Sequence, residues 1–91
     1  MNIAFAGLRH GHIFALHEMA LKHPEYTVTG AWEEDPVARA AAQEKGVDCC
    51  YATLEELLAD PAVEAVALGG CFADRGGVAI AALKAGKHVI A

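Results

Sequence analysis

The first 33 residues of the chain carry the pattern that most restricts its fold. A short apolar strand, Asn2–Ala6, ends at Gly7, and residues 7–12 form a turn that runs into an amphipathic helix. A second strand then ends at Glu33. In such a unit the backbone N–H groups of the turn and the helix N-terminus face a pyrophosphate, and the acid accepts hydrogen bonds from a ribose. The order strand, glycine turn, helix, strand, acid therefore predicts a dinucleotide-binding unit.

Length and charge narrow the class of protein and its partners. The chain has 91 residues and a formal net charge of −5, which is consistent with one small domain on a single core. Nucleic acids and anionic membranes bind basic surfaces, so we expect neither as a partner. Arg9, His10 and His12 follow only a few apolar residues, and we therefore expect no signal peptide or membrane span at the N-terminus.

The cysteines indicate a reducing compartment. There are three of them, Cys49, Cys50 and Cys71, and they lack the spacing of a metal site. The odd number and the direct adjacency of Cys49 and Cys50 disfavour a structural disulfide. Free thiols are typical of the cytoplasm, which is the location that we predict.

Local signals predict two helices in the first half of the chain. Apolar residues at helical spacing follow the turn, and Pro24 ends that helix. They are Ile13, Leu16, Ala20 and Leu21. Asp35 is a helix N-cap with Pro36 at the first helical position, and Gly46 is the matching C-terminal stop.

Two further helices are predicted in the second half. Thr53 and Glu56 form a capping box that begins a short helix, and Asp60 and Pro61 close it. A loop over residues 69–77 then leads into a fourth helix that ends at Gly86. The apolar residues of this helix are Val78, Ala81, Ala82 and Leu83.

These helices alternate with five predicted strands, which define the fold class. The strands cover residues 2–6, 26–32, 48–51, 65–68 and 88–90. Strands that alternate with helices through short turns form a parallel sheet with right-handed crossovers. We therefore predict an α/β fold, a Rossmann-type doubly wound parallel sheet of about five strands with four helices, in one domain over residues 1–91.

Four stretches of the sequence resemble the N-terminal domain of the Gfo/Idh/MocA oxidoreductases, named for glucose–fructose oxidoreductase and inositol dehydrogenase. They are "NIAFAGLRHGHI", "VTGAWEEDPVARA", "YATLEELLADPAVEAVAL" and "AALKAGKHVIA". The resemblance implies an NAD(P)-binding domain. In the intact protein it implies hydride transfer between the nicotinamide and a hydroxyl carbon of a sugar, cyclitol or related polyol.

In that family a helix ending in A-G-K-H-V leads to a strand and then to an E-K-P or D-K-P motif with the catalytic lysine. The resemblance covers all 91 residues and stops where this motif begins. We therefore expect a fragment of a larger two-domain protein, without the catalytic lysine and the substrate domain. No catalytic residue is assigned, and no dehydrogenase activity is expected of the chain by itself. Whether it is an enzyme stays open.

The candidate cofactor-binding residues begin with the glycine turn, which departs from the G-x-G-x-x-G pattern. Arg9 stands at the second glycine position and His12 at the third, while Gly11 falls one place early. Arg9 could instead offer a charge-assisted contact to the phosphates. The alternative is that Gly7 and Gly11 only permit a tight turn. The predicted phosphate cradle comprises Gly7, Leu8, Arg9, His10, Gly11 and His12.

Glu33 corresponds to the acidic residue that follows the second strand in the family. A carboxylate there favours a free 2′-hydroxyl and repels a 2′-phosphate, so NAD is predicted in preference to NADP. Glu34 adds to the repulsion. The alternative is a solvated acidic loop over residues 33–35, in which Asp35 is only the cap of the next helix.

Gly69, Gly70 and Cys71 follow the fourth predicted strand, at the edge where ligands of α/β proteins bind, and complete the predicted cofactor site. Cys71 is favoured as an inert thiol rather than a reactive one. Trp32 and Phe72 could flank an adenine, although aromatic residues at such places more often belong to the core. His10, His12 and His17 have poor spacing for a metal, and none is predicted.

Two other functions remain open: a non-catalytic nucleotide-binding or assembly module with the same fold, and a fragment with no independent role. In addition to a dinucleotide partner, we expect a homodimer or higher self-association. The predicted strand over residues 88–90 presents unpaired N–H and C=O groups at the edge of the sheet, and such an edge can pair with a second copy.

Overall fold

A computed structural model describes residues 1–9, 13–69 and 72–90 and contains a parallel sheet of four strands. The strands are β1 (Asn2–Ala6), β2 (Thr27–Trp32), β3 (Ala65–Leu68) and β4 (His88–Ile90), in the order β2-β1-β3-β4. The helices are α1 (Ile13–Lys22), α2 (Pro36–Glu44), α3 (Leu54–Ala59) and α4 (Phe72–Lys84). The predicted α/β parallel fold is confirmed.

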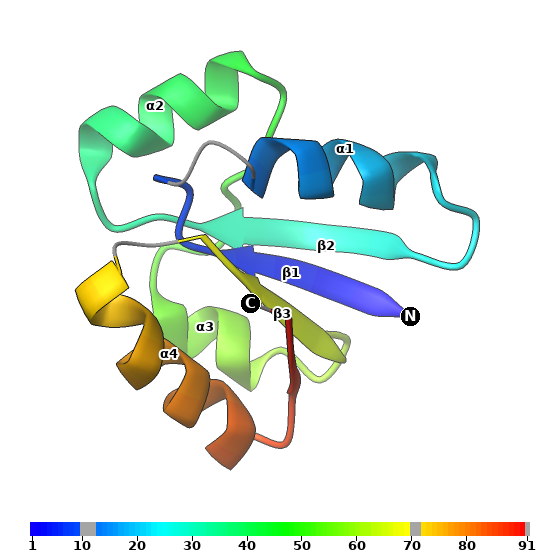
Figure 1. The fold of residues 1–91 in the computed structure, drawn as a ribbon, viewed down its shortest axis with the longest axis vertical. Helices are drawn as coiled ribbons and strands as arrows, with labels where there is room; N and C mark the ends of the chain where they lie inside the picture. Colours follow the sequence, from blue (N-terminus) through cyan, green and yellow to red (C-terminus); the bar gives the residue numbers. More distant parts are fainter. Residues whose placement is uncertain (10–12, 70–71, 91) are drawn as a thin grey trace.

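Helices cover both faces of the sheet, α1 and α2 on one side and α3 and α4 on the other (Figure 1). The alternation of β1 divides the core between these faces. Ile3 and Phe5 join the apolar cluster under α1 and α2, whereas Ala4 and Ala6 join the cluster under α3 and α4. All four residues of β3 are buried, as expected of a central parallel strand.

The predicted helix caps are confirmed. Asp35 accepts a hydrogen bond from the Ala38 amide at 2.9 Å, and Pro36 begins α2. Thr53 Oγ1 accepts one from the Glu56 amide at 3.1 Å. The carboxylate of Glu56 binds the amide of Ala52 rather than that of Thr53, so the capping box is displaced by one residue on its return side.

One predicted strand is wrong. The segment over residues 48–51 is not a strand, although it runs beside β2: the amide of Ala31 donates to Asp48 O at 2.9 Å and the amide of Tyr51 donates to Ala31 O at 3.2 Å. These bonds lie one residue further apart than a regular parallel ladder requires, so the pairing is interrupted by an extra residue.

The predicted loop over residues 69–77 is largely helix, because α4 begins at Phe72. Gly76 and Gly77 suggested a loop, but both lie inside this helix, where a Cβ would meet nothing within 4 Å. Each glycine costs a helix only about 1 kcal/mol relative to alanine. Packing against β3 and β4 outweighs that local preference.

The buried face of α1 also differs from the expected one. Leu21 is 60% exposed, whereas His17 is buried with Ile13 and Ala20. The His17 ring stands edge-on to Phe5, with 5.2 Å between ring centroids. Burial lowers the pKa of His17 by disfavouring the charged imidazolium. His17 is therefore a core residue.

Candidate functional site

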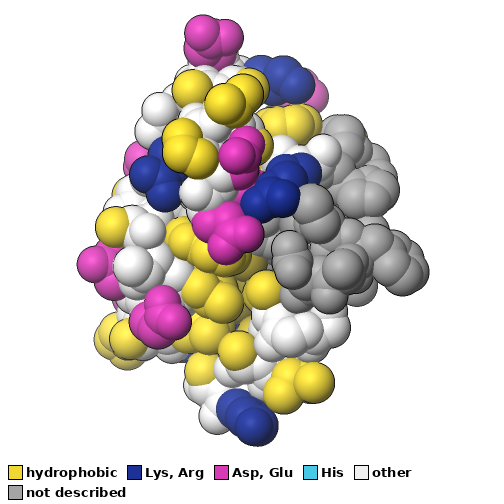
Figure 2. All heavy atoms as spheres, turned by 90° about the vertical axis from the view of Figure 1, so that its left-hand side faces the viewer, with side chains coloured by type: hydrophobic (Ala, Val, Ile, Leu, Met, Phe, Trp, Pro, Cys, Tyr) yellow, Lys and Arg dark blue, Asp and Glu magenta, His cyan; other side chains and the backbone are white. Residues whose placement is uncertain are grey.

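A cavity of about 590 Å³ opens at the carboxyl ends of the strands, where α/β proteins bind ligands. Its walls come from the ends of β1, β2 and β3 and from the first turn of α3 and the middle of α4. Figure 2 shows this face, with hydrophobic side chains bordered by acidic and basic ones. The lining residues include Ala6, Gly7, Arg9, Trp32, Glu33, Glu34, Arg39, Thr53, Leu54, Glu55, Leu68, Gly77 and Val78.

Backbone hydrogen bonds connect the glycine turn and the neighbouring ends of β1, β2 and β3. Gly7 adopts φ 86°, a left-handed conformation that favours glycine, and its amide donates to Trp32 O at 2.8 Å. The amide of Arg9 donates to Gly69 O at 3.0 Å, and the amide of Gly69 donates to Ala6 O at 3.1 Å. The described part of the predicted phosphate cradle, residues 7–9, therefore has a defined backbone.

Gly69 is a packing residue as well as a predicted cofactor residue. A Cβ at this position would lie 2.6 Å from the carbonyl oxygen of Gly7 and 2.6 Å from Cγ1 of Ile13. Only a glycine therefore allows β3 to end against both the turn and the start of α1. The sequence predicted Gly69 as part of the cofactor site, but it gave no signal for the close approach of Gly69 to Gly7 and Ile13.

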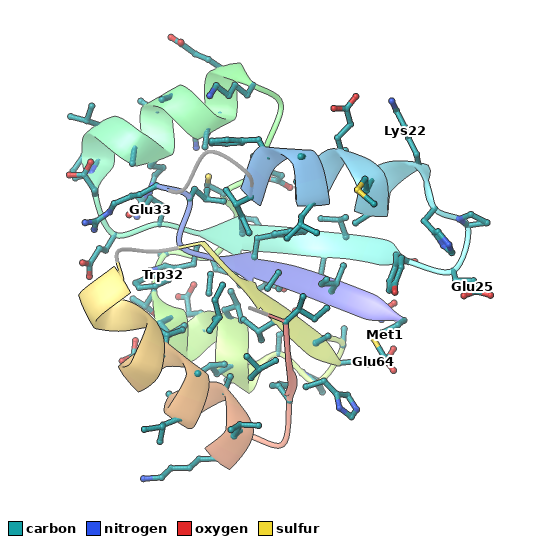
Figure 3. All side chains as sticks on the ribbon, in the orientation of Figure 1. Met1, Lys22, Glu25, Trp32, Glu33 and Glu64 are labelled. Carbon is teal, nitrogen blue, oxygen red and sulfur yellow. The ribbon has the colours of Figure 1, made fainter. Side chains whose placement is uncertain are left out.

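Glu33 lies at the carboxyl end of β2, at the opposite end of the strands from Met1, Glu25 and Glu64 (Figure 3). Only 1% of it is exposed. Its Oε1 accepts a hydrogen bond from the Leu8 amide at 2.7 Å, and its Oε2 accepts one from the Asp35 amide at 2.8 Å. Its carboxylate thus holds the glycine turn and the beginning of α2 together. The alternative of a solvated acidic loop is wrong for Glu33, because this residue is buried. The same alternative predicted that Asp35 caps the next helix, and this capping role is correct.

Two arginines surround this acid. Arg9 Nε lies 3.2 Å from Glu33 Oε2, and Arg9 Nη2 lies 3.1 Å from Glu34 Oε1. Arg39 donates from Nε and Nη2 to the carbonyl oxygen of Glu33 at 3.1 and 2.8 Å. Sequence reasoning missed Arg39. The available signal was its position one helical turn after the Asp35 cap, which places it near the end of β2.

The apolar wall of the cavity was only partly foreseen. Trp32 lines the cavity and also packs against the apolar cluster under α3 and α4, so both of its predicted roles stay open. Leu54, Leu68 and Val78 line the cavity from three other elements. These three residues were identified only as helix or strand residues, because sequence periodicity does not reveal which ends of the elements meet.

Five predicted site residues lie outside the described part of the chain: His10, Gly11, His12, Gly70 and Cys71. Within the described ranges, no group of three or more histidine, cysteine or acidic side chains is placed to hold a metal ion. Cys49 and Cys50 are free thiols whose pKa is raised chiefly by burial. No described helix has the length and apolar character needed to cross a membrane.

The fold and this site define a dinucleotide-binding α/β domain. A family profile described as "Oxidoreductase family, NAD-binding Rossmann fold" matches residues 1–91. The chain belongs to the Gfo/Idh/MocA oxidoreductase family, of which it is the NAD-binding Rossmann domain.

Solved structures agree with this assignment. A protein from Erwinia carotovora atroseptica SCRI1043 superposes with a TM-score of 0.86 at 26% identity, over 98% of this chain and 27% of that one. An NAD-binding protein from Listeria innocua gives 0.79 at 31% identity, over 97% and 26%.

Biliverdin reductase from Synechocystis sp. PCC 6803, solved with biliverdin and NADP+, shares the fold. Its TM-score is 0.80 at 24% identity, over 97% of this chain and 28% of that one. The chain thus spans about a quarter of the length of these proteins. A comparison with curated proteins gave no match.

Proposed function

We propose that the chain binds NAD in preference to NADP in the cavity at the carboxyl ends of its strands. The observation that carries this proposal is the joint placement of Gly7, Glu33 and Glu34 around one cavity. An adenine fits the apolar wall formed by Trp32, Leu54 and Val78 in chemical character. The acids at the end of β2 favour ribose hydroxyls over a 2′-phosphate.

The residues present fit a dinucleotide in chemical character. Gly7 lets the backbone of the turn approach a ligand, and the cavity of about 590 Å³ has both an apolar wall and a charged rim. Arg9 stands on the turn, where a guanidinium attracts phosphate oxygens. Bound NAD supplies hydride transfer at its nicotinamide, while this domain's residues bind and orient the cofactor.

We further propose that the whole protein is a cytoplasmic dehydrogenase of the sugar, cyclitol or related polyol class. Membership of the oxidoreductase family supports the reaction class. The free thiols of Cys49 and Cys50 support the compartment. In this proposal the 91 residues supply the cofactor site.

Calorimetric titration of the purified chain with NAD+ and NADP+ tests the binding proposal. We expect weak binding, with NAD+ the tighter ligand. Gly77→Phe should abolish binding of both, because Gly77 lines the cavity and its Cβ position is open. Gly76→Phe is the matched control, since Gly76 has the same open surroundings on the same helix but does not line the cavity. Tighter binding of NADP+ by the unaltered chain would contradict the stated preference.

We also propose that the chain self-associates through β4. Among the described strands, β4 lies at one end of the sheet order, and Ile90 borders an apolar groove of about 450 Å³ that also includes Phe5, Leu16 and Met19. An open strand edge beside apolar surface is a site for pairing with a second copy.

Light scattering over a concentration series should give a mass above that of a monomer at about tens of micromolar, a range in which a micromolar dissociation constant populates the dimer. Ile90→Asp should lower this mass, whereas Val37→Asp on α2, a residue 77% exposed and outside the groove, should not. A monomer at every concentration would overturn the proposal.

A further inference from the structure

Five charged side chains among the described residues line the cavity, and their contacts are unequal. They are Arg9, Arg39, Glu33, Glu34 and Glu55, so these five side chains together carry one net negative charge. Glu33 is buried and bonded to backbone amides, whereas Glu34 is 60% exposed at its side chain. Glu55 lies in the first turn of α3, on another wall of the cavity.

Arg9 forms ion pairs with two acids, of which Glu33 supports the fold and Glu34 can be substituted without removing that support. Its Nε pairs with Glu33, whose position is set by the glycine turn and the start of α2. Its Nη2 pairs with Glu34, a surface side chain that does not support the fold in this way. The Arg9 side chain itself is 32% exposed, so a ligand can reach it.

We propose that Glu34 sets the choice between NAD and NADP by occupying Arg9, and that Arg9 and Arg39 form a latent site for a 2′-phosphate. The inference rests on the proposed function, which places the adenosine ribose beside Glu33 and Glu34. A guanidinium bonded to both acids stands at that same place. A phosphate offers several acceptor oxygens with the geometry that a guanidinium binds in pairs.

Arg39 contributes charge to this latent site. Both of its described bonds go to a carbonyl oxygen, which has no formal charge to neutralise the guanidinium. Without the carboxylate of Glu34, the charges of these described side chains sum to zero and the Nη2 of Arg9 loses one acceptor. A dianionic 2′-phosphate is then opposed by less charge and gains a donor.

The test compares the ratio of the dissociation constants of NADP+ and NAD+ in the unaltered chain, Glu34→Gln and Glu55→Gln. Both variants remove one negative charge from the cavity, but only Glu34 contacts Arg9. We expect Glu34→Gln to shift the ratio toward NADP+ by about tenfold, the effect of one charge-assisted contact. The shift in Glu55→Gln should be about twofold, as for a screened surface charge.

The pair adenosine 2′,5′-bisphosphate and AMP isolates the contribution of the 2′-phosphate. Glu34→Gln should strengthen binding of the bisphosphate and leave AMP nearly unchanged. In an Arg9→Gln background the additional effect of Glu34→Gln should disappear. Circular dichroism of each variant verifies that the fold is retained.

Equal shifts in Glu34→Gln and Glu55→Gln would overturn the inference, because a general field would then explain the preference. Persistence of the Glu34→Gln shift without Arg9 would also overturn it. If the unaltered chain binds NAD+ but the variants behave alike, only this inference fails. If the chain binds neither dinucleotide, the proposed function fails as well.

Discussion

Gly69→Ala is expected to destabilise the domain by about 2–3 kcal/mol, the range typical of overpacking in a rigid core. The added Cβ would lie 2.6 Å from Gly7 O and 2.8 Å from Cβ of Ile13, closer than side chains approach such atoms. Neither neighbour can yield freely, because one is backbone and the other is 1% exposed. Urea denaturation monitored by circular dichroism measures the change.

Gly77→Ala is the control for this substitution. A Cβ at Gly77 meets nothing within 4 Å, and the residue lies inside α4. Alanine there should stabilise the domain by up to about 1 kcal/mol through helix propensity. An unchanged urea midpoint for Gly69→Ala would contradict the close approach of β3, the glycine turn and α1.

Glu33→Gln is expected to cost about 2–4 kcal/mol, because buried donors bonded to a carboxylate lose an acceptor. Leu8 N and Asp35 N bind different oxygens of Glu33, at 2.7 and 2.8 Å. A glutamine can present its carbonyl oxygen to only one of these amides, and its NH2 group then faces the other. The free energy of unfolding from urea titration is the direct measurement.

Glu34→Gln serves as the control, since it removes the same charge from an exposed neighbour and should cost less than about 1 kcal/mol. Hydrogen exchange at the amide of Leu8 adds a local test, because this amide should exchange faster in Glu33→Gln than in Glu34→Gln. Equal stability losses in the two variants would show that Glu33 does not support the turn.

Sequence-based prediction succeeded where the information is local. Asp35, Pro36 and Thr53 act on amides within a few residues of themselves, so their capping roles do not depend on the remainder of the fold. The apolar run at Ala65–Leu68 similarly identified a strand buried on both faces. These signals were sufficient to predict the order of the elements and the parallel sheet.

Prediction failed where a long-range contact opposes a local preference. Residues 48–51 have strand character, but their bonds to Ala31 are separated by an extra residue, which interrupts the ladder. Gly76 and Gly77 disfavour a helix locally, and the packing of α4 on the sheet overrides them. In α1, the position beside Phe5 decides that His17 is buried and Leu21 is not.

The sequence by itself determined the class of site: an apolar strand, a glycine turn, a helix and an acid at the end of the next strand. Only the tertiary structure decided how that acid is used. Glu33 and Leu8 are 25 positions apart, and their bond exists because β1 and β2 lie side by side in the sheet. Similarly, the approach of Gly69 to Gly7 depends on the pairing of β1 with β3. A pattern of residues predicts which strand ends meet, but the direction of each side chain there depends on the packing of the other strands and helices around it.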